Sequence, residues 1–231
     1  MRVQLLNKKM SKKVVILGGE GNGGVIANAI ADANLRGYDE WECLGFLNDR
    51  YPIGTIIDSF PVLGSIDDGV QQFLDKGCFF INTILRIDGQ NDRIRMFDGL
   101  GIPNERMALF VHPLSYLAPN VRLEPGCVIM PNVSISSNTH IGRCGLVMVG
   151  ATIGHDNEIG DFCHVAAQAC VGAKLKVGKG VHFGLNCTVR ENLTIGDYAT
   201  IGMGAVLTKN VGEKEIWAGN PAKFLRMAED K

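Results

Sequence analysis

A six-residue repeat in the second half of this 231-residue chain constrains its fold more than any other feature. From Leu117 to Leu207 every sixth residue is aliphatic or aromatic, through sixteen hexads in one register. The residue four positions later is usually small or apolar, and glycine often follows the first position, as in IGRCGL and VGKGVH. Neither the 3.6-residue period of a helix nor the two-residue period of an ordinary strand gives this pattern. It is typical of a parallel β-helix, in which each hexad forms one short strand and one turn that glycine tolerates.

Residues 13–111 carry a different pattern, in which short apolar runs alternate with helical segments. This alternation predicts a small parallel α/β sheet, about half the size of a complete dinucleotide-binding fold. The strands expected are KKVVILGG, ECLGFLND, CFFINTI and MALFVH, with helices near 23–35, 68–76 and 92–101. The last residues, FLRMAEDK, favour a short terminal helix.

A glycine-rich turn follows the first expected strand. Residues 19–24, GEGNGG, satisfy GxGxxG, and the amides at a helix N-terminus behind such a turn attract phosphate. Asp49, near the end of the second strand, is suited to hydrogen-bonding a ribose or a base. We favour the diphosphate of a nucleotide-sugar as the ligand; an NAD site and a purely structural turn stay open as alternatives.

The five histidines include one with an acidic neighbour. His155 stands two residues after the interior position Ile153, where the chain turns outward, and Asp156 follows it. Imidazole, with an unperturbed pKa of about 6.5, transfers protons well near neutral pH, and an adjacent carboxylate fixes its tautomer. His155 and Asp156 are therefore candidate functional residues, the alternative being a surface histidine in a loop. His112, which precedes Pro113, is interpreted as structural.

Composition excludes several classes of protein. With 46% hydrophobic and 20% charged residues and a net charge of -1, the chain is typical of a soluble globular protein, without the basic surplus of a nucleic-acid binder. No apolar run approaches the ~20 residues that span a bilayer, and the first residues lack a signal peptide, so we expect a cytoplasmic protein without membrane contact. Seven cysteines without a CxxC pair favour small buried side chains over disulfides or zinc.

The order of these features, with the motif HDNEIGDFCH at 155–164, resembles a known family. It is similar to the bacterial sugar O-acyltransferases of the sialic-acid O-acetyltransferase type, which include the nucleotide-amino-sugar N-acetyltransferases of the bacillosamine and perosamine pathways. FPVLGS at 60–65, His112-Pro113 and AGNPAK at 218–223 extend the resemblance over nearly the whole chain.

The resemblance implies a Rossmann-like half-domain that binds a nucleotide-sugar (13–111), a left-handed β-helix acetyltransferase domain (112–212) and a tail (213–231). Three hexads would close one triangular coil, so that residues three hexads apart stack in columns such as Ile135, Ile153, Val171 and Val189. It also implies a homotrimer that holds its coenzyme in grooves between neighbouring subunits.

Site residues are carried over by position in the motifs. The resemblance makes His155 the general base and Asp156 the acid that raises its basicity. Contacts to acetyl-CoA are expected from His164, Ala173, Leu185 and Met203, and no metal is expected. Substrate contacts are expected from Glu20, Gly21, Asn22, Asn48, Asp49 and Ile84.

Four positions depart from the family pattern. Asn22 replaces the histidine of a usual GHG turn, Asn48 replaces the first of two aspartates, Ile84 replaces a glycine, and Met148 replaces an asparagine seven residues before the base. The first three replacements concern the identity of the sugar and of the nucleotide base in the substrate, and the last concerns the coenzyme site.

The function predicted is acetyl-CoA-dependent N-acetylation of a nucleotide-linked amino-sugar, such as a 4-amino-4,6-dideoxyhexose, for surface glycans. The amine would attack the thioester directly, because no nucleophile stands beside His155. A sugar O-acetyltransferase is the nearest alternative, and a noncatalytic nucleotide-sugar-binding scaffold is the alternative of another class. The stacked His164 and His182 also raise a metal site like that of the hexapeptide-repeat carbonic anhydrases, which needs three converging imidazoles.

Overall fold

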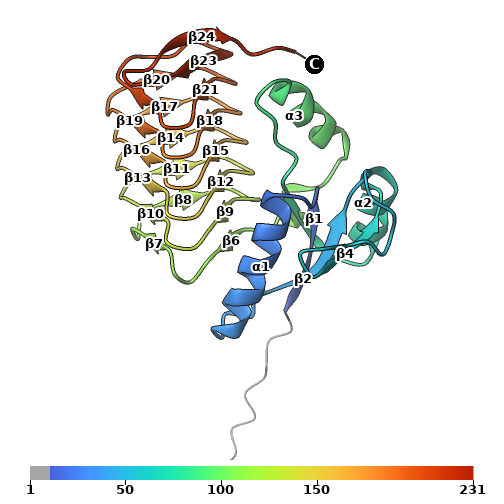
Figure 1. The fold of residues 1–231 in the computed structure, drawn as a ribbon. Coiled ribbons are helices and arrows are strands. Elements are labelled where there is room, and N and C mark those ends of the chain that lie inside the picture. Colours follow the sequence, from blue (N-terminus) through green and yellow to red (C-terminus); the bar gives the residue numbers. More distant parts are fainter. Residues whose placement is uncertain (1–10, 231) are drawn as a thin grey trace, which may run out of the picture.

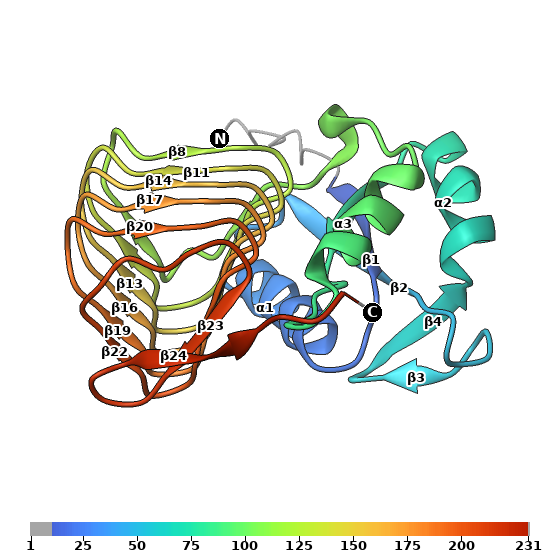
Figure 2. The same cartoon turned by 90° about the horizontal axis from the view of Figure 1, so that it is seen from above.

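The computed structural model, which describes residues 11–230, consists of a stack of short parallel strands packed beside a small sheet with three α-helices (Figure 1). The stack contains three sheets, here called faces 1, 2 and 3, in which each two-residue strand pairs in parallel with a strand that lies three hexads away. Figure 2 shows the coils from above. The expected β-helix is therefore confirmed.

The strands are distributed over the faces as follows. Face 1 contains β7 (Tyr116–Leu117), β10 (Ser134–Ile135), β13 (Thr152–Ile153), β16 (Cys170–Val171), β19 (Thr188–Val189) and β22 (Val206–Leu207). Face 2 contains β8 (Arg122–Leu123), β11 (His140–Ile141), β14 (Glu158–Ile159), β17 (Lys176–Val177) and β20 (Thr194–Ile195). Face 3 contains β6 (Phe110–Val111), β9 (Val128–Ile129), β12 (Leu146–Val147), β15 (His164–Val165), β18 (His182–Phe183), β21 (Thr200–Ile201), β23 (Glu215–Ala218) and β24 (Lys223–Met227). The turn from face 1 to face 2 is called the first corner, and the turn from face 3 to face 1 the third corner.

The repeated aliphatic residues fill the interior of the coils. Ile153 pairs with Ile135 below it and Val171 above it, and Val171 pairs with Val189, so the predicted column forms. Every repeat position from Ile129 to Leu207 is buried, while the two at the open end are partly covered. Burial of each such side chain contributes about 1.5–3 kcal/mol, which makes the repeat the main source of stability here.

The glycine after the interior residue has a different cause from the one expected. The left-handed backbone conformation occurs two positions later, at residues such as Asn138 and Asp156, both with φ of 57°. A Cβ atom on Gly154 would instead lie 2.7 Å from the carbonyl carbon and oxygen of Gly172 in the next coil. Glycine is needed because adjacent coils stack closely, and not because the turn requires a positive φ.

The N-terminal sheet has the strand order β3-β4-β2-β1-β5, with β3 antiparallel to β4 and the other pairs parallel. Its strands are β1 (Lys12–Leu17), β2 (Trp41–Leu47), β3 (Ile56–Ile57), β4 (Phe60–Gly64) and β5 (Phe79–Asn82). The helices are α1 (Asn22–Leu35), α2 (Ile66–Asp75) and α3 (Gln90–Gly99), with a 3-10 turn η1 (Asn104–Arg106). Within the described residues, none of these helices has the length and apolar character needed to cross a membrane.

The alternation of side chains in β1 divides the core into two layers. Val14 and Ile16 belong to the cluster that contains α1 and the interior of the β-helix, whereas Val15 and Leu17 pack with α2 and α3. Helix α1 therefore lies between the sheet and the β-helix (Figure 1).

Two contacts help to fix the two parts together. The Phe97 ring of α3 packs edge-on against Phe162, with ring centroids 5.4 Å apart. His112 is fully buried, and its Nε2 atom lies 3.0 Å from Asp32 of α1, which agrees with the structural role expected for it. Burial is the main cause that lowers the pKa of His112.

Three sequence expectations are wrong in whole or in part. The strand expected at MALFVH joins the N-terminal sheet only through an isolated bridge between Met107 and Phe80 of β5; its later residues form β6, which pairs with β9 in face 3, because the chain already enters the first coil there. FLRMAEDK forms no helix in its described part; β24 pairs antiparallel with β23, whose open edge offers backbone partners. The short β3–β4 hairpin lies where no strand was expected.

Candidate active site

His155 and Asp156 stand on the first corner, between β13 and β14. The Nδ1 atom of His155 lies 2.7 Å from Oδ2 of Asp156, and the two side chains are 52% and 41% exposed. A carboxylate accepts a hydrogen bond, so the Nδ1 atom carries the proton and Nε2 keeps its lone pair. Among the described residues only Nδ1 of this ring has a hydrogen-bond partner. The arrangement is that of a general base open to a ligand.

A ladder of asparagines supports the acid of this pair. Asn138, one coil below, donates from Nδ2 to Oδ1 of Asp156 at 2.9 Å, and Asn120, one coil further down, donates to Asn138. The hydrogen bond from His155, followed by that from Asn138, holds the pKa of Asp156 below its usual value of 3.8. Both carboxylate oxygens are engaged, which orients Asp156 toward the imidazole. The sequence analysis missed these asparagines, although their spacing of three hexads is the signal that reveals them.

A second group of predicted residues surrounds a cavity of about 540 Å³ against face 3. His164, Leu185 and Met203 line it, together with Asn22 and Ile87 from the N-terminal part. Most of the remaining lining is apolar: Met148, Ala166, Ala167, Ile216, Ala218 and Leu225. An apolar cavity with a few polar groups is the usual form of a small-molecule site.

Two imidazoles meet in the wall of this cavity. His164 and His182 are cross-strand neighbours in β15 and β18, and their Nδ1 atoms are 3.0 Å apart. The Nε2 atom of His164 is buried and has no hydrogen-bond partner among the described residues. Burial lowers the pKa of His164 to about 3 and that of His182 to about 4. A charge on His182 would lower the pKa of His164 further. Both rings are therefore neutral at physiological pH.

The chain does not bring all the predicted coenzyme residues together. Ala173 stands on the first corner, one coil above His155, whose carbonyl oxygen accepts a hydrogen bond from the Lys174 amide at 2.9 Å. His164 belongs to face 3 and Leu185 to the third corner. Within one chain the interior of the β-helix separates these two groups.

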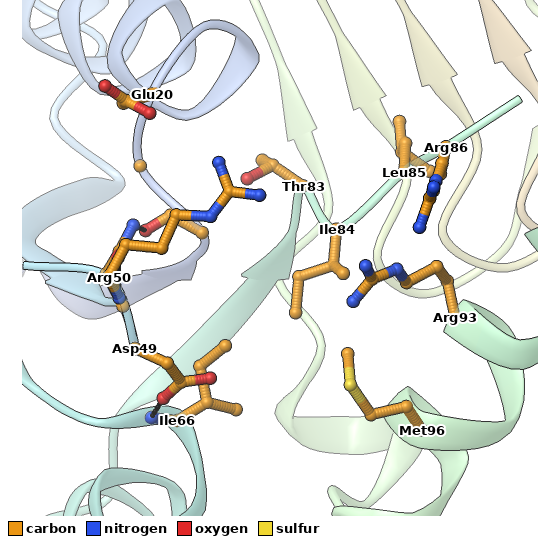
Figure 3. A pocket seen from close by; sticks show the side chains of 13 residues that line it. Glu20, Asp49, Arg50, Ile66, Thr83, Ile84, Leu85, Arg86, Arg93 and Met96 are labelled. Carbon is orange, nitrogen blue, oxygen red and sulfur yellow. Dashed lines mark hydrogen bonds between the residues drawn. The ribbon is translucent and has the colours of Figure 1, made fainter. Parts of the chain in front are cut away.

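A larger cavity of about 700 Å³ opens at the glycine-rich turn (Figure 3). It contains four of the predicted substrate residues, namely Glu20, Asn48, Asp49 and Ile84. It also contains three arginines that the sequence analysis did not identify: Arg50, Arg86 and Arg93. Figure 3 shows Arg50 on one side of the cavity and Arg86 with Arg93 on the other. Guanidinium groups around such a cavity favour a ligand with phosphate groups.

The polar residues at the mouth also hold their own loops. Asn48 donates to the carbonyl oxygen of Gly18 at 2.9 Å and so fixes the glycine turn. Asp49 accepts a hydrogen bond from the Ile66 amide at 2.8 Å and therefore anchors the start of α2. Glu20 accepts a hydrogen bond from Tyr51, which raises the pKa of that phenol.

The remaining two predicted substrate residues lie at the start of α1. Gly21 precedes the helix with φ of 66°, a conformation that suits glycine. Asn22 lines the cavity on face 3 and not the larger one. The two cavities are neighbours, because residues 83–86 line the larger one and Ile87 lines the other.

The cysteine within the HDNEIGDFCH motif is not a reactive thiol. Cys163 is buried, donates from its Sγ atom to the Gly178 carbonyl oxygen at 3.1 Å, and has its pKa raised to about 12 by burial. A thiol in this state supplies no thiolate nucleophile. Within residues 11–230, no three His, Cys, Asp or Glu side chains gather closely enough to hold a metal ion, so the pair His164 and His182 has no third ligand among those residues.

Similar solved structures share this architecture. PerB from Caulobacter crescentus, in complex with CoA and GDP-perosamine, is 22% identical with a TM-score of 0.78, covering 93% of this chain and 97% of its own. The acetyltransferase domain of PglB from Neisseria gonorrhoeae FA1090, in complex with acetyl coenzyme A, is 24% identical with a TM-score of 0.77, covering 93% and 100%. WeeI from Acinetobacter baumannii AYE is 21% identical with a TM-score of 0.72, covering 93% and 100%. The resemblance to hexapeptide-repeat sugar acetyltransferases is thus confirmed at the level of the fold.

No protein-family model matches this chain, and no curated protein sequence matches it.

Proposed function

We propose that this chain is an acetyl-CoA-dependent N-acetyltransferase that acts on a nucleotide-linked amino-sugar. The observation that carries the proposal is the hydrogen bond between Nδ1 of His155 and Asp156 on an exposed corner of the β-helix. The fold adds support, because PerB, which has this architecture, is described in complex with CoA and GDP-perosamine. The preferred acceptor is the amine of a 4-amino-4,6-dideoxyhexose.

His155 acts as general base in this proposal. Its Nε2 atom takes a proton from the sugar amine as the nitrogen attacks the thioester carbonyl carbon. Asp156 stabilises the imidazolium that forms, through the hydrogen bond at Nδ1. The new N–C bond replaces the C–S bond, and the departing CoA sulfur receives the proton from His155. Transfer is proposed to be direct, since the thiol within the motif, Cys163, is buried and protonated.

The cavity at the glycine-rich turn is proposed to bind the nucleotide-sugar. Its volume of about 700 Å³ suits a ligand of that size, and Arg50, Arg86 and Arg93 match a diphosphate in charge. The N-terminal sheet, as a Rossmann-like half-domain, would present the amides of residues 18–24 to the same phosphates. Glu20, Asn48, Asp49 and Ile84 line that cavity beside the sugar and the base.

We further propose that the active protein is a homotrimer of left-handed β-helices. His155 and Ala173 stand on the first corner, while His164, Leu185 and Met203 surround the cavity on face 3. A ring in which the first corner of one copy faces the cavity of the next unites these residues in each of three grooves. Acetyl-CoA would lie in that groove, which adjoins the larger cavity.

The reaction belongs in the cytoplasm in this proposal, because acetyl-CoA and nucleotide-sugars are cytoplasmic metabolites and the products feed surface glycans. A hydroxyl acceptor would make the protein an O-acetyltransferase with the same base and coenzyme site. A scaffold that binds nucleotide-sugars without catalysis would need no base.

The test combines purified protein, acetyl-CoA and a panel of GDP-, UDP- and dTDP-linked amino-sugars. Release of the CoA thiol and mass spectrometry of the sugar measure transfer. The His155→Asn variant should lose about 100- to 10,000-fold in kcat, the range for a general base. His140→Asn is the matched control: its imidazole also contacts carboxylates, those of Glu124 and Glu158, and its loss should leave kcat within a few-fold. Equal activity of wild type and His155→Asn would refute the proposal.

The trimer has a separate test. Light scattering should give three chains per particle. Co-expression of His155→Asn with a second chain carrying Met203→Arg, which blocks the face 3 cavity, should restore part of the activity that each variant lacks alone. No recovery in demonstrated mixed particles would mean that each site lies within one chain.

A further inference from the structure

The partly buried histidine pair on face 3 is a hydrogen-bonded contact between two neutral rings. The Nδ1 atoms of His164 and His182 are 3.0 Å apart, and the ring centroids are 4.8 Å apart. At that distance one nitrogen must donate an N–H and the other must accept it. A neutral imidazole carries a proton on only one of its two nitrogens. The direction of this hydrogen bond therefore decides which nitrogen of His164 is protonated.

The surroundings keep the pair uncharged. The cavity beside it is lined mainly by apolar side chains, and its one charged lining residue, Arg226, pairs with Asp88 at 2.8 Å. Burial lowers the pKa of both imidazoles, so neither becomes a cation in the range in which the protein works. His164 lines the cavity, and its covered Nε2 atom is therefore either an N–H donor or a bare acceptor.

We propose that His182 is a positioning residue: its Nδ1–H donates to Nδ1 of His164 and so holds the proton of His164 on Nε2, where it donates to the carbonyl oxygen of the thioester. This inference rests on the proposed function, since a thioester carbonyl only accepts hydrogen bonds. The buried Nε2 of His164, which has no partner among the described residues, is the atom left for that contact. The opposite direction would turn a lone pair toward the carbonyl oxygen and repel it.

The consequence for the reaction is electrostatic. The carbonyl oxygen gains negative charge as the amine attacks, and the Nε2–H group of His164 stabilises that charge without giving up its proton. No bond to either imidazole forms or breaks. His182 gives no hydrogen bond to either substrate in this proposal; it acts by fixing the tautomer and the ring orientation of His164, as an outer partner does for a metal-ligating histidine.

Two substitutions separate this role from simple packing. His182→Leu removes the donor and fills the space, whereas His182→Asn retains an amide N–H near the position of Nδ1. We expect His182→Leu to lower kcat about 10- to 100-fold, with the KM for acetyl-CoA within about threefold, because the contact strengthens only in the transition state. His182→Asn should recover most of the lost kcat. A rise in KM at unchanged kcat, or no recovery in His182→Asn, would overturn the proposal.

A measurement on the free wild-type protein keeps the inference separate from the proposed function. Nitrogen-15 NMR of labelled histidine distinguishes a protonated from an unprotonated ring nitrogen. We expect the proton of His164 on Nε2 and that of His182 on Nδ1, and the opposite pattern would overturn the inference even if the protein transfers acetyl groups. If the expected tautomers appear and no amino-sugar is acetylated, the proposed function fails while the direction of the hydrogen bond stands.

Discussion

Acid should weaken this fold through the two imidazoles on face 3. In the unfolded chain a histidine has a pKa of about 6.5, whereas in the folded protein burial lowers the pKa of His164 to about 3 and that of His182 to about 4. Below about pH 6.5 these two imidazoles therefore bind protons in the unfolded chain but stay unprotonated in the folded protein. Stability is complete above pH 6.5 and falls as the pH drops toward the folded pKa values. From pH 8 to pH 5 each imidazole should remove about 2 kcal/mol, or about 4 kcal/mol for the pair.

Such a loss is a large part of the 5–15 kcal/mol that stabilises a typical protein, so it can be measured. Urea unfolding at pH 8, 6.5 and 5, at one protein concentration, gives the free energy of unfolding for the wild type and for a variant with both His164→Leu and His182→Leu. The double variant should lose about 4 kcal/mol less than the wild type. His112, which is also buried with a lowered pKa, contributes equally to both proteins and cancels. The Asp156 carboxylate affects stability only near and below its usual pKa of 3.8. If both proteins lose the same free energy between pH 8 and pH 5, the reasoning is refuted.

Three further predictions concern packing, the asparagine ladder and the large cavity. Gly154→Ala should lower the free energy of unfolding by about 1–3 kcal/mol, because the new Cβ would lie 2.7 Å from backbone atoms of the next coil. The control Gly99→Ala, in α3, should be neutral or stabilising, because its Cβ would meet open space. Equal effects of the two substitutions in urea unfolding would contradict the close-stacking argument. Asn138→Ala should reduce kcat by about three- to tenfold through loss of one hydrogen bond to Asp156, the proposed partner of the base. The control is Asn192→Ala, which changes a residue with the same left-handed backbone two coils above Asp156 and should not lower kcat. A similar loss of kcat in both variants would exclude a specific role for the asparagine ladder. Arg93→Ala should raise the KM for the nucleotide-sugar about tenfold, because one charged hydrogen bond to the ligand is lost. The KM for acetyl-CoA should stay unchanged. An equal change in both KM values would argue against a phosphate contact.

The β-helix could be predicted from sequence because its interior repeats. Each interior residue such as Ile153 meets its own kind one coil away, so one local pattern specifies a whole column of contacts. The pairing of β6 with β9 follows no such pattern: Phe110 continues an apolar run that suits either sheet, and only tertiary packing assigns it to face 3. The strand β24 was missed for the same reason, since its partner is the edge of β23 and not a neighbour in a repeat.

The candidate site divides in a similar way. His155 and Asp156 are adjacent in sequence, so their contact could be expected from the motif. Arg50, Arg86 and Arg93 come from segments that no local pattern relates, and only the fold brings them to one cavity. The stacking of His164 on His182 was visible in the sequence from their separation by three hexads, but their hydrogen bond depends on ring orientations that spacing does not determine.

The pairing of each strand with the one three hexads later also limits how this chain can change in length. An insertion of three hexads between two coils adds one complete turn and returns every later side chain to its original face. An insertion of a single hexad between His155 and His164 would move every later side chain by one face, and the face 3 cavity would no longer open toward helix α1. Relatives with longer or shorter stacks should therefore differ by whole coils, whereas extra residues of any other number should bulge outward as loops at the corners.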